Sequence, residues 1–264
     1  MNSAADITWP DLALGFVLLI IPFFILWYYK TGLFKSAVIA VIRMTAQLLL
    51  IGLYLEYIFM LNNLWINLGW VMIMVMIATV TTVRNSELYL RYYFIPVFIS
   101  LAISLIIVDV YFLGIVIKLD NMYDAIYLIP ITGMLLGNSI RTNVLGLSSY
   151  YKKLQKEQTL YRYALANGAT HSEALIPYMK TALKTSFSPT IATMAVIGLI
   201  SLPGMMTGQI LGGSSPTVAI KYQIMLMITI FVSSVLTVVL TIFISNRFIF
   251  DSFYNLKMKI INER

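Results

Sequence analysis

Residues 92–116 read YYFIPVFISLAISLIIVDVYFLGIV, a run of mostly apolar side chains that contains one charged residue, Asp109. About 20 such residues let an α-helix cross the hydrocarbon core of a bilayer. Six other runs have the same character. The predicted spans are 10–29, 36–58, 66–83, 92–116, 125–149, 188–211 and 218–246. This pattern predicts an all-α integral membrane protein, with residues 1–264 forming a single transmembrane domain.

The composition agrees with a membrane protein and excludes several kinds of site. Hydrophobic residues make up 60% of the chain and charged residues 11%, and the mean hydropathy is +0.87. Soluble domains carry about 25% charged residues. The chain has no cysteine and one histidine, His171. Disulfides, cysteine catalysis and a zinc site of Cys and His ligands are therefore excluded.

The positions of Lys and Arg predict the orientation. Cytoplasmic loops of membrane proteins carry an excess of these residues. With the N-terminus outside, the inner positions are Lys30, Lys35, Arg84, Arg91, Lys152, Lys153, Lys156, Arg162, Lys180, Lys184, Arg247, Lys257, Lys259 and Arg264. Only Lys118 and Lys221 fall outside. We therefore expect a protein of the cell (inner or plasma) membrane whose C-terminus lies in the cytoplasm. The first apolar run follows Asp6 and Asp11 instead of a basic segment, which predicts a retained helix.

Residues 150–187 form the longest polar segment, which the orientation places in the cytoplasm. Residues 154–158 and 160–166 are expected to be helical, and Gly168 interrupts them. Thr170 or Ser172 is a candidate cap for a second helix that begins near Glu173. The segment therefore predicts a helix–turn–helix hairpin that docks on a soluble partner, or an amphipathic loop on the bilayer surface.

Charged residues within spans are costly unless they are paired or hydrated. Arg43 and Arg141 are predicted at similar depth on the inner side, and Gln47 lies one turn from Arg43. Glu56 and Asp109 lie toward the outer ends of their spans. One interpretation is a polar translocation path. The other is that the arginines extend to the interface and bind carbonyls or lipid phosphates.

The span at 188–211 contains Pro203 and Gly204, and proline removes a backbone hydrogen bond. Interrupted helices often mark translocation pathways. Met205, Met206 and Gln209 are therefore candidates to line a path, although methionine more often serves packing. Glycines spaced GxxxG allow close helix approach. They are Gly133, Gly137, Gly204, Gly208 and Gly212.

Three segments resemble a known family. They are 130–139 (PITGMLLGNS), 198–211 (GLISLPGMMTGQIL) and 43–48 (RMTAQL). These are similar to the FetB/YbbM-type permeases of ABC transporters, and the resemblance extends over about residues 37–247. It implies a permease subunit that pairs with a separate ATPase and is linked to iron export, and plant relatives are linked to aluminium tolerance. It also places Asn138 in the translocation pathway.

The segment 163–177 resembles the coupling loop of ABC permeases, in which a glycine follows an Ala-rich turn. The coupling residues that this implies are Ala164, Asn167, Gly168, Ala169, Thr170 and Pro177. The acidic residue that opens the usual pattern is absent, because Arg162 and Tyr163 stand there. The implied partners are an ABC ATPase, which would bind ATP and Mg, and a second copy of this chain.

The chain carries no HExxH, GxSxG or Walker A motif, so we expect a transporter subunit that is not itself an enzyme. No cofactor is expected on this chain, and no nucleic acid. His171 is interpreted as a solvated loop residue. Hard cations such as iron prefer carboxylates, while two inner arginines favour an anionic or chelated cargo. The alternatives are an ATP-independent secondary transporter or channel, and a structural membrane scaffold.

Overall fold

The computed structural model describes residues 8–200 and 202–257, and its secondary structure there is helical. Ser201 of the segment 198–211 lies outside the described residues, as do Asp6, Lys259 and Arg264. The elements are α1 Trp9–Val17, α2 Ile20–Tyr28, α3 Phe34–Leu61, α4 Leu64–Asn85, α5 Leu90–Asp109, the π-helix η1 Val110–Val116, α6 Ala125–Lys156, α7 Gln158–Ala166, α8 His171–Val196, α9 Gly204–Leu211 and α10 Pro216–Ile249.

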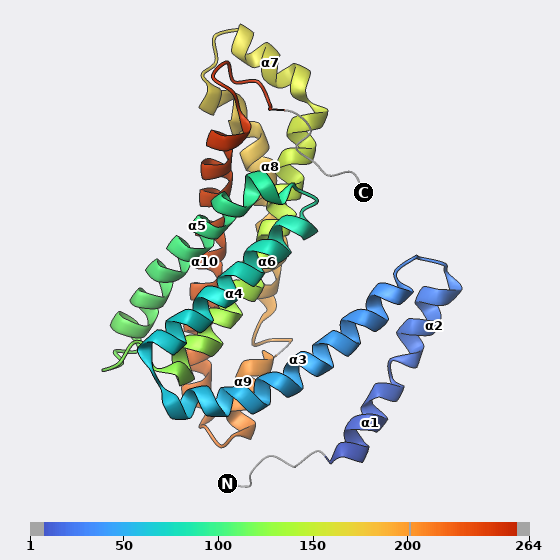
Figure 1. Ribbon diagram of the computed structural model, residues 1–264, viewed down its shortest axis with the longest axis vertical. Coiled ribbons are helices and arrows are strands. Elements are labelled where there is room, and N and C mark those ends of the chain that lie inside the picture. Colours follow the sequence, from blue (N-terminus) through green and yellow to red (C-terminus); the bar gives the residue numbers. More distant parts are fainter. Residues whose placement is uncertain (1–7, 201, 258–264) are drawn as a thin grey trace.

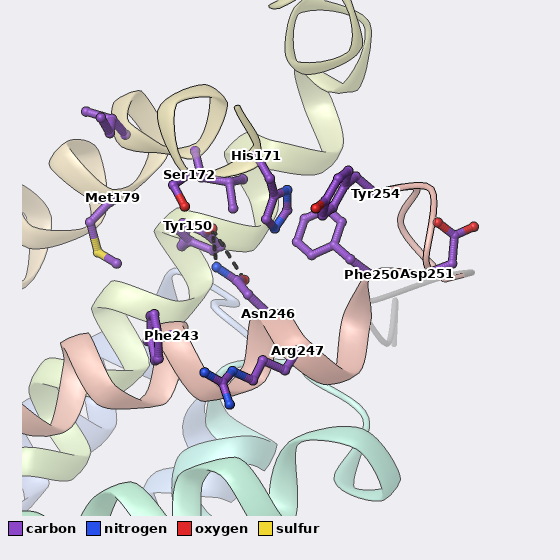
Figure 2. A pocket seen from close by; sticks show the side chains of 12 residues that line it. Tyr150, His171, Ser172, Met179, Phe243, Asn246, Arg247, Phe250, Asp251 and Tyr254 are labelled. Carbon is purple, nitrogen blue, oxygen red and sulfur yellow. Dashed lines mark hydrogen bonds between the residues drawn. The ribbon is translucent and has the colours of Figure 1, made fainter. Parts of the chain in front are cut away.

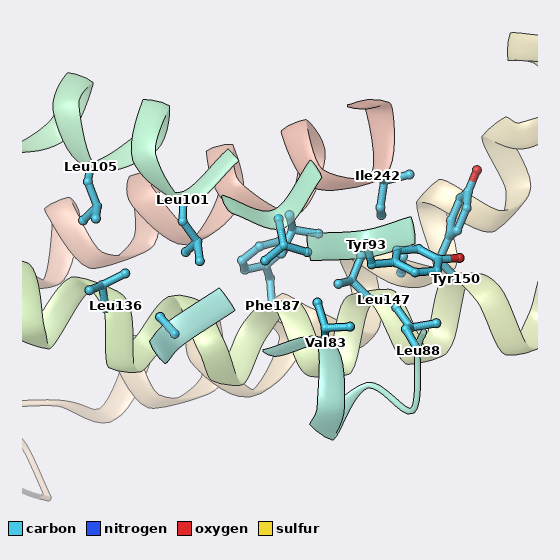
Figure 3. Packing of buried hydrophobic residues seen from close by; sticks show 14 of the residues in the cluster. Val83, Leu88, Tyr93, Leu101, Leu105, Leu136, Leu147, Tyr150, Phe187 and Ile242 are labelled. Atoms are coloured by element: carbon cyan, nitrogen blue, oxygen red, sulfur yellow. The ribbon is translucent and has the colours of Figure 1, made fainter. Parts of the chain in front are cut away.

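Helices α4, α5, α6, α8 and α10 pack side by side into one elongated bundle (Figure 1). Its core is a continuous apolar cluster whose members include Leu101, Leu135, Leu147 and Ile242 (Figure 3). α7 and the described C-terminal segment lie at one end of the bundle, and α9 lies at the other (Figure 1). These are called the α7 end and the α9 end; the predicted orientation would place the α7 end in the cytoplasm.

The first three helices form an arm that stands apart from the bundle (Figure 1). α3 is 28 residues long and buries only Ile58, and α1 and α2 bury no residue. The arm joins the bundle near the α9 end, where Ile58 packs with Ala125 and Ile129 of α6. Most of the apolar surface of the arm therefore has no protein cover in the single chain.

Five of the seven predicted spans are long and apolar enough to cross a membrane: Trp9–Tyr28, Phe34–Leu61, Leu64–Asn85, Leu90–Val116 and Pro216–Ile249. The other two coincide with α6, whose buried face is partly polar, and with α8 and α9. The run 188–211 is not one helix, because α8 ends at Val196 and α9 begins at Gly204. Seven spans therefore stay a prediction.

α6 packs closely against two neighbours at Gly146. A Cβ atom there would lie 2.5 Å from Ser186 Oγ of α8 and 3.1 Å from Val238 Cγ1 of α10. Gly137, on the same helix, would meet nothing within 4 Å, and neither would Gly204 or Gly208. The close approach inside this chain is thus at Gly146 and not at those GxxxG glycines.

We expect Gly146→Ala to destabilise the bundle, because the added methyl forces α8 or α10 outward. Such overpacking costs about 1–3 kcal/mol. Gly69→Ala on α4 is the matched control, since it adds the same methyl where nothing lies within 4 Å. Thermal unfolding in detergent measures both. Equal melting temperatures for the two variants would contradict the packing at Gly146.

Candidate functional site

The α7–α8 turn is held by backbone and side-chain bonds at its own ends. Gly168 has a φ of +89°, which favours glycine, and lets the chain reverse after α7. The Asn167 side chain donates to the Tyr163 carbonyl at 2.7 Å. Thr170 caps α8 as predicted, in a reciprocal capping box with Glu173. The turn is therefore short and conformationally restricted.

The cap also stabilises the ionised form of the Glu173 carboxyl. The backbone and side chain of Thr170 both donate hydrogen bonds to its carboxylate, and they lower the pKa of Glu173. Ala164 packs partly against the core, whereas Gly168 and Pro177 are exposed. α8 continues through Pro177 and Pro189 without a break. The predicted coupling residues thus lie along the end of α7, the turn and the first turns of α8, and their coupling role stays a prediction.

His171 is not the solvated loop residue that we predicted. Its ring stacks on Tyr254 with centroids 4.5 Å apart and meets Phe250 edge-on at 4.6 Å (Figure 2). Its Nδ1 lies 2.8 Å from the Tyr161 hydroxyl, which also lies 3.1 Å from the Tyr254 carbonyl. His171 therefore joins the α7–α8 turn to the segment 250–257. No local sequence pattern predicted this contact.

A cavity of about 500 Å³ opens beside this contact. Its wall combines Ser172 and Met179 of α8, Phe243 and Arg247 of α10, and Tyr150 of α6 (Figure 2). Tyr150 and Asn246 bond to each other across it, with Asn246 Nδ2 donating to the Tyr150 hydroxyl at 3.0 Å. The cavity thus lies between α6, α8 and α10, next to the turn, and we call it the α7-end cavity.

A second cavity, of about 300 Å³, lies at the α9 end, where 188–211 is interrupted. Met205 and Gln209 of α9 line it together with Pro130 and Tyr127 of α6 and Tyr222 of α10. Met206 instead points into the protein and is 7% exposed. Pro203 precedes α9 as its N-cap residue. The structure therefore brings together two of the predicted pathway residues, Met205 and Gln209.

Asp109 is a buried carboxyl in the bundle, 7% exposed. The Thr132 hydroxyl of α6 donates to its Oδ2 at 2.9 Å, while its Oδ1 has no hydrogen-bond partner. The π-helix η1 begins at the next residue, and π-helical turns are frequent at functional sites. Asp109 lies apart from the other predicted charges and does not share a site with them.

Arg43, Gln47 and Glu56 are exposed on α3, in the arm. Arg141 is exposed on α6, and Asn138 donates to the Met134 carbonyl of its own helix. The described residues contain one ion pair, Lys152–Glu87, so neither arginine is paired there. Within one chain these residues line no common cavity among those described.

α10 carries a regular polar pattern that was not predicted from the sequence. A hydroxyl stands at every fourth residue, at Thr229, Ser233, Thr237, Thr241 and Ser245, and all five are buried. The buried face of α6 carries Thr132, Ser139, Asn143 and Tyr150. We call these nine residues the polar seam. The spacing in 218–246 could have revealed half of it, because residues four apart share a helix face.

Comparison with known proteins places the chain among membrane permeases. A chain from Escherichia coli named "Probable iron export permease protein FetB" is 29% identical over 99% of this chain and 97% of its own length. The Bacillus subtilis membrane protein YjkA is 32% identical over 87% and 90%. The Arabidopsis thaliana protein ALUMINUM SENSITIVE 3 is 35% identical over 71% and 67%. No solved structure matches significantly.

These relatives confirm the resemblance seen in 43–48, 130–139 and 198–211. They support a multi-pass membrane protein of the permease class, and one is itself named a permease. The family model described as "Uncharacterised protein family (UPF0014)" matches residues 9–250, which is most of the chain. The chain therefore belongs to the UPF0014 family.

Proposed function

We propose that this chain is the membrane-spanning permease subunit of an ATP-driven ABC transporter. The α7–α8 turn carries the proposal: it is restricted by Gly168 and the Thr170–Glu173 cap, and His171 ties it to the end of α10. A fixed turn of this kind can receive motion from a soluble ATPase and pass it to α6 and α8. ATP and Mg²⁺ would bind to that separate subunit.

The proposed cargo is iron or another metal, free or chelated, moved outward. The support is the name of the Escherichia coli relative, an iron export permease. Met205 and Gln209 at the α9-end cavity offer thioether and amide ligands. Arg43 and Arg141, if they line the path, favour a chelated or anionic form of the metal.

The transporter would contain two copies of this chain. An arginine facing lipid costs several kcal/mol, and Arg43 and Arg141 are both exposed in the single chain. The arm has almost no cover, and Gly137 faces open space. A second copy that packs between the arm and α6 would cover these residues and enclose a path between the copies.

A secondary transporter or channel is the second candidate. Asp109 favours it, because a buried carboxyl with a free oxygen could take part in ion or proton movement without an ATPase. The two candidates differ in whether the chain requires a partner that hydrolyses ATP.

Tagged chain purified from native membranes in mild detergent is expected to carry an ATPase subunit with a Walker A motif, in fixed ratio, and to hydrolyse ATP. Replacing Gly168 and Ala169 together by Glu should remove that subunit, because bulky charges would occupy the docking surface. Thr159→Glu, exposed at the start of α7, is the control. No such partner, with ion flux in liposomes that contain this chain alone, would favour the second candidate.

The chain has no cysteine, so introduced cysteines report contacts between copies without background. Copies with Gln47→Cys and copies with Arg141→Cys, each with its own tag, are expected to cross-link in membranes through a bifunctional thiol reagent. Ile107→Cys, on the exposed face of α5, replaces either partner as control. Cross-linking no stronger than with the control would contradict the packing of α3 against α6 of a second copy.

The contact between His171 and the segment 250–257 should weaken in acid. Burial lowers the pKa of His171 below its usual 6.5, so the folded contact disfavours the protonated ring. The stabilisation from this contact is therefore fully present above about pH 6.5 and is lost as the pH falls through the lowered pKa of His171. Burial raises the pKa of Tyr161 to about 12, and hydrogen bonds from Asn255 lower that of Asp251, so neither titrates in this window.

A spin label on Ser252→Cys is expected to become more mobile as the pH falls from 7 to 5. His171→Phe keeps an aromatic ring between Phe250 and Tyr254 but cannot titrate, so its label should respond to pH much less. The same mobility change in both proteins would show that His171 does not set the acid response.

A further inference from the structure

The polar seam leaves several buried polar atoms without partners. They include the Thr241 and Ser245 hydroxyls of α10 and the Ser139 hydroxyl and Asn143 Oδ1 of α6. Asp109 Oδ1 of α5, beside the seam, has no partner either. Thr237 and Thr142 differ, because each donates to a carbonyl of its own helix, at 2.7 and 3.1 Å. An unsatisfied buried polar group costs about 1–3 kcal/mol. Such groups in folded proteins are usually satisfied by ordered water.

The seam runs from Asp109 to the α7-end cavity. Thr132 of α6 bonds to Asp109, and on the same face of α6 Ser139 and Asn143 lead to Tyr150, which bonds to Asn246 in the cavity wall. Between these ends, the Ser104 hydroxyl donates to the Ser233 carbonyl at 2.9 Å, joining α5 to the hydroxyls of α10. Polar side chains thus recur along the buried faces of α6 and α10 between that cavity and the buried carboxyl.

The hydroxyl row of α10 does not stay on one face of the helix. Each four-residue step on a helix advances the face by about 40°, so the row turns around α10 as it descends. Ser233 meets α5, whereas Asn246, next to Ser245, meets Tyr150 of α6. Apolar side chains fill the opposite faces, which are exposed at Ile228 and Phe243. Water held along the seam would therefore be enclosed by α5, α6 and α10.

Asp109 has no ionic partner to compensate a charge. It forms no salt bridge, and the ion pair among the described residues lies elsewhere. α4 has no titratable residue between Leu64 and Val83. Toward the α9 end, η1 carries Tyr111, which is exposed. Tyr127 of α6 and Lys221 and Tyr222 of α10 line cavities at that end. The one described hydrogen bond of its carboxyl is from Thr132.

We propose that the polar seam holds a file of water between the α7-end cavity and Asp109, and that Asp109 Oδ1 binds a proton that moves along this file. The reaction is proton uptake alone. A water molecule of the seam passes a proton to an Asp109 oxygen, and a proton from bulk solvent enters through the cavity and replaces the one that the water gave up. The site does not depend on an ATPase, so it stands whether or not the chain is an ABC permease.

Infrared spectroscopy of the full chain in nanodiscs tests the proposal directly. We expect a carboxylic acid carbonyl band that disappears in Asp109→Asn and shifts when the buffer is changed to D₂O. Absence of an Asp109-dependent band across the accessible pH range would overturn the proposal, because the carboxyl would then hold no proton.

The exchange rate of that band tests the file. Thr241→Val removes a hydroxyl without a partner and should slow the shift in D₂O several-fold. Thr142→Val is the matched control, because it removes a buried hydroxyl that is already bonded to its own helix. Thermal unfolding checks that both variants fold. Equal exchange rates in the two folded variants would overturn the path through α10.

Labelling tests the entrance. Ser172→Cys places a thiol in the wall of the α7-end cavity, and a bulky reagent there should slow the exchange of the Asp109 band. Ser252→Cys, exposed in the C-terminal segment outside that wall, is the control. Unchanged exchange after complete labelling at 172 would show that the proton reaches Asp109 by another route.

Discussion

A polar side chain between membrane helices has no bulk water to bond with, so it must find partners inside the protein. This constraint determines which side chains of the bundle face inward. α6 and α10 place their hydroxyl and amide groups inward, and their apolar residues face outward or toward the core cluster. Gly146 leaves room for Ser186 of α8 and Val238 of α10, which a side chain there would displace. The polar interior and the tight packing are therefore built on the same two helices.

The same constraint divides the chain into two unequal parts. The bundle encloses most of its polar groups but exposes Arg141 of α6, whereas the arm exposes Arg43, Gln47 and Glu56 on a helix that buries one residue. A bilayer can cover the apolar residues of α3, whereas the charged ones need protein or water. The arm and the surface of α6 at Arg141 are thus the parts whose environment one chain does not supply.

The sequence predicted what depends on local runs of residues. The apolar runs located the helices, Thr170 was a correct candidate cap, and three short segments carried the family resemblance. Contacts between distant segments were not predictable. His171 gave no sign of Phe250 and Tyr254, which lie about eighty residues away. α8 passes through Pro177 and Pro189 yet ends at Val196, before Pro203, so the prolines alone did not indicate where the helix ends.

The hydroxyl row of α10 was only partly predictable from the sequence. Its four-residue spacing is visible in the sequence, but serine and threonine in membrane helices often bond only to their own backbone, as Thr237 does. What distinguishes Thr241 and Ser245 is that their hydroxyls are buried and unpartnered, and this follows only from the packing of α10 against its neighbours. Since Asp109 has the same property at the other end, the row is better explained as a route for water than as packing alone.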